Sequence, residues 1–199
     1  MACSTAAVSA TLGLIAGFLA YPVLADDTQN IPDTKRTKAA LYLTASEAFE
    51  VLKNDDVLLI DVRSRPEVSF VGIPERVNVH IPLMVMPETA HYDPEKRSYD
   101  LEPNPSFEFD FLDYAETLDL PDDAPIVIIC RSGSRSAKAA NIIYELGYTQ
   151  VYSVIDGFEG DKAKDGIERG HRAVNGWKNA GLDWSYSIAP EQVYPSDLK

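Results

Sequence analysis

The run Ile-Val-Ile-Ile-Cys-Arg-Ser-Gly-Ser-Arg-Ser, from Ile126 to Ser136, decides the fold of this chain. It opens with four apolar residues in succession, a pattern typical of a strand buried inside a parallel sheet. From about Ser134 to Leu146 apolar residues recur at helical spacing, and Gly147 follows as a stop signal. The apolar helical positions are Ala137, Ala140, Ile143 and Tyr144. The stretch therefore predicts a buried strand, a tight loop and a helix in direct succession.

Cys130 lies in that loop, and we interpret it as a candidate nucleophile rather than a structural thiol. A thiol reacts as its thiolate, which is stabilised by amide N–H groups at a helix start and by nearby guanidinium groups. Arg131 and Arg135 supply two such groups, and Gly133 lets the backbone turn tightly. A buried structural cysteine needs neither feature. The hypothesis requires a sulfur that is held by main-chain amides and is open to solvent.

The spacing between the cysteine and the second arginine separates two chemistries. Four residues, 131–134, stand between Cys130 and Arg135. Cysteine-dependent phosphatases have one residue more at this place, which makes their loop wide enough for a phosphate. The shorter loop of this chain predicts a smaller ring of main-chain amides, matched to a sulfur atom carried on Cys130.

Further motifs flank the loop in a fixed order and extend the pattern from Thr44 to Trp184. They are Asp61-Val62-Arg63, Ile73-Pro74 with Asn78-Val79 and Ile81-Pro82, then Cys130 to Ser136, Val154 to Phe158, and Gly176-Trp177. In this order they resemble the rhodanese family of sulfurtransferases. Two positions depart from the family pattern. Gly72 stands where many members have a histidine, and His80 is an extra residue before Ile81-Pro82.

The resemblance implies a fold, a reaction and roles for single residues. The fold is a rhodanese-like three-layer α/β sandwich, with a mainly parallel central sheet flanked by helices. The reaction is transfer of a sulfane sulfur from thiosulfate or a similar small anionic donor, through a Cys130 persulfide, to a thiol or cyanide-like acceptor. Asp61 and Arg63 organise the loop. No cofactor and no metal are implied, and the residues that bind the donor are Arg131, Ser132, Gly133, Ser134, Arg135 and Ser136.

Two other functions stay open on the sequence alone. One is a non-catalytic module of the same fold, which binds a protein partner through the long segment 84–104. Segments of that length in compact domains are usually functional or flexible. The other is arsenate or phosphate-ester chemistry, which resembles the same fold with a longer loop.

Charge and cysteine content exclude several classes of function. The formal net charge of −13 disfavours binding to nucleic acid or to an anionic membrane surface. The arginines of the loop therefore form a local positive patch on an acidic protein. Apart from Cys130 the chain has one cysteine, Cys3, close to the N-terminus. Removal of that end leaves a single thiol, which excludes an internal disulfide cycle.

The first 25 residues differ in composition from the rest of the chain. They carry no charged side chain before Asp26, have an apolar core from Leu12 to Leu24, and end in the small residue Ala25. This pattern predicts a signal peptide over residues 1–25, cut after Ala25, and a periplasmic or secreted protein. An uncleaved membrane anchor is the competing interpretation, and membrane contact is expected only in that case.

The remaining chain divides into a linker over 26–38, the domain over 39–185 and a tail over 186–199. In the domain, Thr44 and Glu47 form a capping-box pattern ahead of a helix through Leu52. Residues 57–60 read as a buried strand. A second helix, over 105–118, has Phe107, Phe111, Leu112, Ala115 and Leu118 on its apolar face. Trp177 and Trp184 flank a predicted short helix closed by Gly181, and we expect the two tryptophans to cover the sheet edge.

Overall fold

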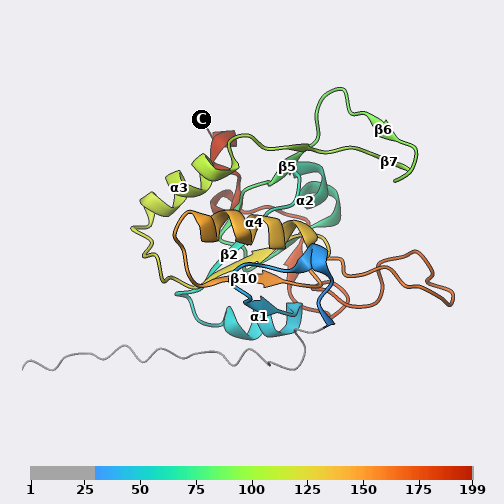
Figure 1. Ribbon diagram of the computed structural model, residues 1–199, viewed down its shortest axis with the longest axis horizontal. Coiled ribbons are helices and arrows are strands. Elements are labelled where there is room, and N and C mark those ends of the chain that lie inside the picture. The colour runs from blue at the N-terminus through green and yellow to red at the C-terminus, as the bar shows by residue number, and fades with distance from the viewer. Residues whose placement is uncertain (1–29, 199) are drawn as a thin grey trace, which may run out of the picture.

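The apolar run at 126–129 forms strand β9 (Ile126–Ile129) at the centre of a parallel sheet (Figure 1). The computed structural model describes residues 30–198. Within that range the main sheet has five strands in the order β1-β10-β9-β2-β4, and every neighbouring pair is parallel. The predicted α/β fold with a mainly parallel sheet is confirmed. The other strands of this sheet are β1 (Tyr42–Leu43), β2 (Leu58–Asp61), β4 (Val79–His80) and β10 (Val151–Val154).

Helices cover both faces of the sheet and complete the three layers. Helices α1 (Ala45–Val51) and α2 (Arg65–Val71) pack on one face. Helices α3 (Phe107–Thr117) and α4 (Ser134–Glu145) pack on the other, so that the sheet lies between α1 and α4 in Figure 1. The capping box predicted for α1 is present, since Thr44 and Glu47 bond each other reciprocally. No helix within residues 30–198 has both the length and the apolar character needed to cross a membrane.

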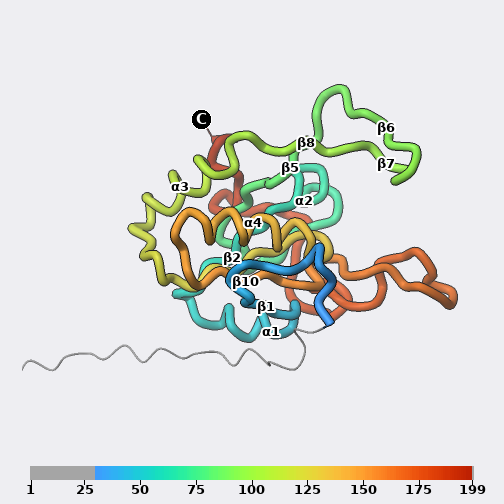
Figure 2. Tube along the Cα trace, in the orientation of Figure 1, coloured from blue at the N-terminus to red at the C-terminus, as the bar shows by residue number. Residues whose placement is uncertain are grey.

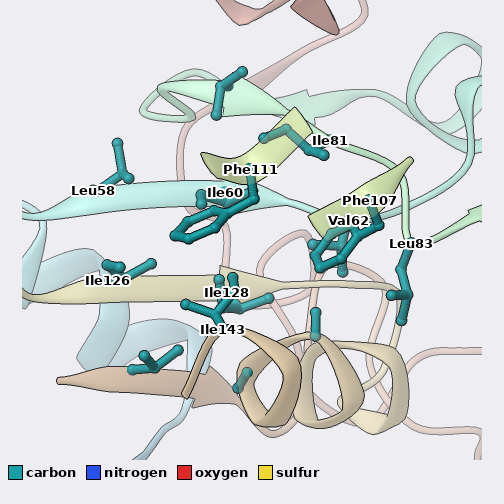
Figure 3. Packing of buried hydrophobic residues seen from close by; sticks show 14 of the residues in the cluster. Leu58, Ile60, Val62, Ile81, Leu83, Phe107, Phe111, Ile126, Ile128 and Ile143 are labelled. Carbon is teal, nitrogen blue, oxygen red and sulfur yellow. The ribbon is translucent and has the colours of Figure 1, made fainter. Parts of the chain in front are cut away.

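Strand alternation divides the core into two halves. Ile60 and Ile128 are paired across β2 and β9 and face α3 and α4, where Figure 3 shows Phe111 lying toward them. Leu59 and Val127 are the next pair and face α1 and α2 instead. Because successive side chains of a strand point to opposite faces, Cys130 points to the α4 side of the sheet.

The segment 84–104 forms a two-part hairpin rather than an irregular loop. Strand β5 (Met84–Val85) pairs with β8 (Glu102–Pro103), and β6 (Tyr92–Asp93) pairs with β7 (Ser98–Tyr99). The outer part projects from the domain at one end, as Figure 2 shows. Tyr92 and Tyr99 contact each other edge to face at its tip and remain exposed.

Several side chains predicted to lie in the core are exposed. Leu112 and Leu118 in the α3 region are 42% and 47% exposed, and Tyr144 of α4 is 38% exposed. These predictions are wrong because each helix buries a narrower stripe than its run of apolar residues suggested. In α3 the buried stripe is Phe107, Asp110, Phe111 and Ala115.

The short helix predicted between the two tryptophans is also absent, since residues 176–182 form turns. Trp184 lies in β11 (Trp184–Ser185), which pairs antiparallel with β3 (Ile73–Pro74). Trp177 is fully buried in the core between the sheet and α1. The two tryptophans therefore hold the end of the domain together through a buried contact and a strand pair, without a helix.

Both ends of the described chain pack onto the domain. Ile31 is buried, and the Lys38 amide donates to Asn141 Oδ1 of α4 at 2.7 Å, so residues 30–38 are not a free linker. Residues after Ser185, expected to be a tail, form 3₁₀ turns at Pro190–Gln192 and Pro195–Leu198. Tyr194 lies between these turns and is buried in the core. The predicted signal segment 1–25 lies outside the described residues.

Candidate active site

The loop that carries Cys130 lies at the carboxyl end of the sheet, between β9 and the first turn of α4. The turn that follows β10 is hydrogen-bonded to this loop through its backbone. Phe158 N–H donates to the Cys130 carbonyl at 2.7 Å, and Glu159 N–H donates to the Arg131 carbonyl at 3.0 Å. Ligands of open parallel sheets bind at this edge, so the position of the loop agrees with a functional role.

Two glycines make this close approach possible. Gly133 has a φ of +102°, and a Cβ there would lie 2.1 Å from the Ile155 carbonyl oxygen. Gly157 has a φ of +65°, and its Cβ would lie 2.5 Å from the Cys130 carbonyl oxygen. Both positions combine a left-handed backbone with a contact that no side chain fits. The loop and the turn beneath it therefore require glycine at one point each.

The Cys130 sulfur has two close polar partners. Gly133 N–H donates to Sγ at 3.2 Å, and Ser136 Oγ lies 3.6 Å from Sγ. Ser136 Oγ also lies 2.8 Å from the Gly133 carbonyl, to which its hydroxyl donates, and receives the Ser153 hydroxyl at 3.0 Å. In this arrangement the thiol donates to Ser136, while the Gly133 amide is placed to stabilise a thiolate.

The sulfur is more enclosed than the sequence suggested. Cys130 is 1% exposed and belongs to the hydrophobic core cluster under α4. The opening to solvent that we expected is therefore not present, and a single amide contacts Sγ instead of a ring. Among residues 30–198, no group accepts a hydrogen bond from the amides of Arg131, Ser132, Ser134, Arg135 or Ser136.

The two arginines of the loop differ in their surroundings. Arg135 is nearly buried and holds Glu67 of α2 through two contacts, Nη1 to Oε2 at 2.6 Å and Nη2 to Oε1 at 2.5 Å. Arg131 lies with its Nε 4.0 Å from Glu67 Oε1, and its side chain is 48% exposed. Arg135 therefore serves an ion pair inside the protein, whereas Arg131 faces solvent at the loop.

Glu67 is a site residue that sequence reasoning missed. Burial raises the pKa of its carboxyl, but the ion pair with Arg135 and the hydrogen bonds from Ser64 outweigh this and lower the pKa to about 2. The Ser64 amide and hydroxyl donate to the same carboxylate at 3.0 and 2.8 Å. A serine followed three residues later by glutamate signals a helix cap, and that signal gives no hint of the second partner, Arg135.

Asp61 and Arg63 form a fully buried pair next to the loop. Arg63 Nη2 donates to Asp61 Oδ2 at 2.6 Å and to the Gly72 carbonyl at 2.8 Å. The guanidinium lies 4.0 Å from the centre of the Phe158 ring. We expected this pair to organise the Cys130 loop by hydrogen bonds, but the side-chain bonds of Asp61 go to Arg63. The pair orders the segment between β2 and β3 instead.

The two departures from the family pattern have local causes. At Gly72 φ is +95°, and a Cβ would lie 2.5 Å from the Trp184 ring, so a histidine does not fit there. His80 is buried, and its Nε2 lies 2.6 Å from the Arg63 carbonyl, which makes Nε2 the protonated nitrogen. Burial lowers the pKa of this imidazole and keeps it neutral. Neither residue reaches Cys130.

Comparison with known proteins extends these observations. The rhodanese-like domain profile matches residues 44–164. An uncharacterized protein of Rickettsia rickettsii is 33% identical over 145 residues, which cover 72% of this chain and 96% of the relative. The thiosulfate sulfurtransferase GlpE of Glaesserella parasuis is 27% identical over 119 residues, which cover 59% of this chain and 82% of that enzyme.

A solved structure agrees with the sequence matches. The crystal structure of Rv0390 from M. tuberculosis superimposes with a TM-score of 0.54 and 32% identity, covering 74% of this chain and 98% of that one. Residues 44–164, which match the family profile, contain strands β2, β4, β9 and β10 of the parallel sheet, the loop from Cys130 to Ser136 and the turn at Gly157. The chain belongs to the rhodanese-like domain family.

Proposed function

We propose that this protein is a sulfurtransferase that carries sulfur as a persulfide on Cys130. The observation that supports this most is the arrangement of donors around the sulfur. Sγ lies 3.2 Å from the Gly133 amide at the start of α4, and five further amides of the loop have no acceptor among residues 30–198. A second sulfur atom on Sγ is an acceptor for such donors. The relative named thiosulfate sulfurtransferase supports the same chemistry.

The first half-reaction forms the persulfide. Once the loop admits the donor, the Cys130 thiol gives its proton to solvent, and the thiolate attacks the outer sulfur of a small anionic donor such as thiosulfate. A bond forms between Sγ and that sulfur. The bond between the two sulfurs of the donor breaks, and its electron pair leaves on sulfite. A preorganised amide donor contributes about 3 kcal/mol to such a step, roughly a hundredfold in rate.

The second half-reaction regenerates the thiolate. A thiolate or cyanide acceptor attacks the outer sulfur of the persulfide, and the electron pair of the sulfur–sulfur bond returns to Sγ. The product is an acceptor persulfide or thiocyanate. The two steps balance without an oxidant or a reductant, so a single thiol is sufficient.

Burial of Cys130 restricts how the donor approaches. Because Cys130 is 1% exposed, the donor has to present its outer sulfur to the loop while its charged oxygens stay at the surface. Arg131, half exposed at the loop, is placed to meet those oxygens. Arg135 keeps the start of α4 fixed to α2 through Glu67 and acts on the donor only indirectly.

The same burial favours a second candidate function, a non-catalytic module that binds a protein through the hairpin at 84–104. That hairpin projects from the domain and exposes Tyr92 and Tyr99. Binding of a protein acceptor through this hairpin is compatible with either function. Export to the periplasm or the medium, with cleavage after Ala25, stays a prediction that rests on the sequence alone.

A steady-state assay separates the candidates. Thiosulfate and cyanide are supplied to the purified protein, and sulfite and thiocyanate are measured. We expect turnover by the wild type and none by Cys130→Ser, with unchanged thermal unfolding of the variant as the control for folding. Normal thiocyanate production by Cys130→Ser would exclude Cys130 as the carrier. A wild type inactive with several sulfur donors favours the binding module, and Cys130-dependent hydrolysis of an aryl phosphate favours phosphate-ester chemistry.

A further inference from the structure

The segment 161–175 forms a projecting loop directly after the turn that supports Cys130. Two backbone bridges, between Lys162 and Arg172 and between Ala163 and Arg169, hold its two sides together. Figure 2 shows this loop in orange at the end of the molecule where α4 begins. The loop lies outside every motif from which the family resemblance was derived. Its position brings basic side chains to the Cys130 end of the sheet.

Arg172 is anchored to the active-site loop through one intermediate residue. Its guanidinium donates to the Gly160 carbonyl, and the Gly160 amide donates to the Arg131 carbonyl at 3.2 Å. The Arg172 carbonyl is in turn held by the Asn179 side chain at 3.1 Å. The guanidinium therefore has a defined position next to Arg131 rather than a free one on a flexible loop.

The Arg172 guanidinium forms no ion pair with a carboxylate of residues 30–198. Within residues 30–198, no carboxylate oxygen lies within 4.0 Å of its guanidinium nitrogens. The nearby acids are Glu159 and Asp161, and Asp161 is held by Lys35 at 2.9 Å. Burial and the positive charge of Arg131 lower the pKa of Arg172, while Glu159, Asp161 and Cys130 raise it. The geometric link between the Arg172 guanidinium and the Cys130 loop is Gly160, which bonds Arg172 through its carbonyl and the Arg131 carbonyl through its amide.

We propose that Arg172 and Arg131 together bind the oxyanion end of the sulfur donor. This inference rests on the proposed sulfur transfer and deepens it by naming the second cation of the donor site. From the sequence we expected Arg135 to be that cation, but Arg135 is paired with Glu67 and is nearly buried. Two guanidinium groups, neither in a close ion pair, suit a small anion with several oxygens, such as the dianion thiosulfate or the monoanion of a thiosulfonate. The donor places its oxygens between them and its outer sulfur toward Cys130.

Kinetics of a matched set of variants test the role of Arg172. Arg172→Ala should raise KM for thiosulfate about tenfold, the effect of one lost charge-assisted contact, and leave KM for cyanide unchanged. Arg172→Lys should recover most of the loss because it keeps the charge. Arg169→Ala removes the same charge from an exposed position of the same loop and serves as the control, with a KM within about twofold of wild type. A thiosulfate KM in Arg172→Ala equal to that of Arg169→Ala would overturn the inference.

A binding measurement separates failure of this inference from failure of the proposed function. Cys130→Ser keeps the donor site and removes the chemistry, so thiosulfate binding to it is measured by calorimetry with and without Arg172→Ala. We expect about tenfold weaker binding in the double variant, and a smaller loss at high salt. If this holds while the wild type transfers no sulfur, the anion site stands and the sulfur transfer is wrong. If the wild type transfers sulfur and binding is unchanged by Arg172→Ala, the site is wrong and the sulfur transfer stands.

Discussion

Gly133 determines how closely the Cys130 loop approaches the strand beside it. Its left-handed backbone turns the chain into α4, and its missing side chain leaves room for the Ile155 carbonyl. The same residue gives the sulfur its amide donor at 3.2 Å. The turn into α4, the contact with Ile155 and the amide donor to the sulfur thus all depend on Gly133, so a substitution there tests all three.

Gly133→Ala should destabilise the domain by about 3 kcal/mol or more, because the new Cβ would lie 2.1 Å from a backbone oxygen that has little freedom to move. The matched control is Gly147→Ala, where φ is +110° and nothing lies within 4 Å of the new Cβ. That variant should lose only about 1 kcal/mol, the strain of a left-handed alanine. Denaturant unfolding measures both. Equal losses would mean that the contact with Ile155 contributes nothing.

The sequence predicts Cys130 as the nucleophile but does not predict all the residues around it. Cys130, Arg131 and Arg135 stand in one run, so their proximity follows from the chain itself. Glu67 is 68 residues away from Arg135 along the chain, and the contact depends on how α2 docks. Arg172 also reaches the loop through the fold. For this reason the sequence predicts donor binding for both Arg131 and Arg135, although Arg135 is paired with Glu67 inside the protein.

At the scale of elements, an ion pair between Glu67 and Arg135 links α2 to α4. Glu67 belongs to the first turn of α2 and Arg135 to the first turn of α4. Because both side chains are mostly shielded from solvent, this pair is expected to contribute more than a surface salt bridge. It joins the two layers of helices across the carboxyl edge of the sheet.

Glu67→Gln should reduce stability at neutral pH and flatten its decline in acid. The folded-state pKa of Glu67 is about 2, below its ordinary value of 4.5, so the stabilisation is complete above pH 4.5 and is lost as the pH falls toward 2. The pKa difference corresponds to about 3 kcal/mol. Unfolding free energies measured from pH 7 down to pH 2 should show the wild type approaching the variant in acid.

The control for this prediction is Glu47→Gln in α1. Glu47 caps its helix with Thr44 in the same way, but the cap is exposed and holds no arginine. Glutamine preserves a capping box, so the loss at neutral pH should stay below about 1 kcal/mol. A gap between wild type and Glu67→Gln that stays constant from pH 7 to pH 2 would contradict the ion pair as its source.

The bounds of helices and strands could be predicted where they depend on local sequence. The strand predicted at 57–60 is observed at Leu58–Asp61, and the helix predicted from Ser134 begins there, because burial and a glycine turn act locally. The burial of helix faces did not follow as well. Leu112 and Leu118 have the spacing of core residues, but the sheet offers α3 only a narrow contact, and their exposure reflects that. The burial of these leucines depends on tertiary packing, which the periodicity of the sequence does not reveal.

At the scale of the whole molecule, the C-terminal segment completes the core. Tyr194 is 4% exposed, bonds Asp110 of α3 through its hydroxyl, and contacts His80 edge to face. Figure 1 shows the C-terminus lying beside α3. The sequence predicts a tail after Ser185, whereas Tyr194 lies buried in the core.

Tyr194→Ala should therefore destabilise the entire domain by about 3 kcal/mol, the usual cost of removing a buried aromatic ring. Tyr186→Ala is the matched control. Tyr186 also lies beyond the predicted end of the domain, but it is 63% exposed and contacts Trp184 only at the surface. Its loss should be about 1 kcal/mol or less. Similar midpoints of thermal unfolding for the two variants would indicate that residues after Ser185 are dispensable.

The three-layer architecture could be predicted because alternating strands and helices leave few arrangements that bury both faces of a sheet. The enclosure of the thiol could not, since it depends on how the loop, α2 and the turn at Gly157 meet. Because the thiol is enclosed, the proposed sulfur transfer requires that the loop makes room for one more atom on Sγ.

The most direct test is the intact mass of the purified protein after incubation with thiosulfate and removal of excess reagent. The account predicts that wild type gains the mass of one sulfur atom, that cyanide removes it, and that Cys130→Ser gains nothing. A wild-type mass that stays unchanged with thiosulfate and with other sulfane-sulfur donors, while the protein is folded, would contradict a persulfide on Cys130.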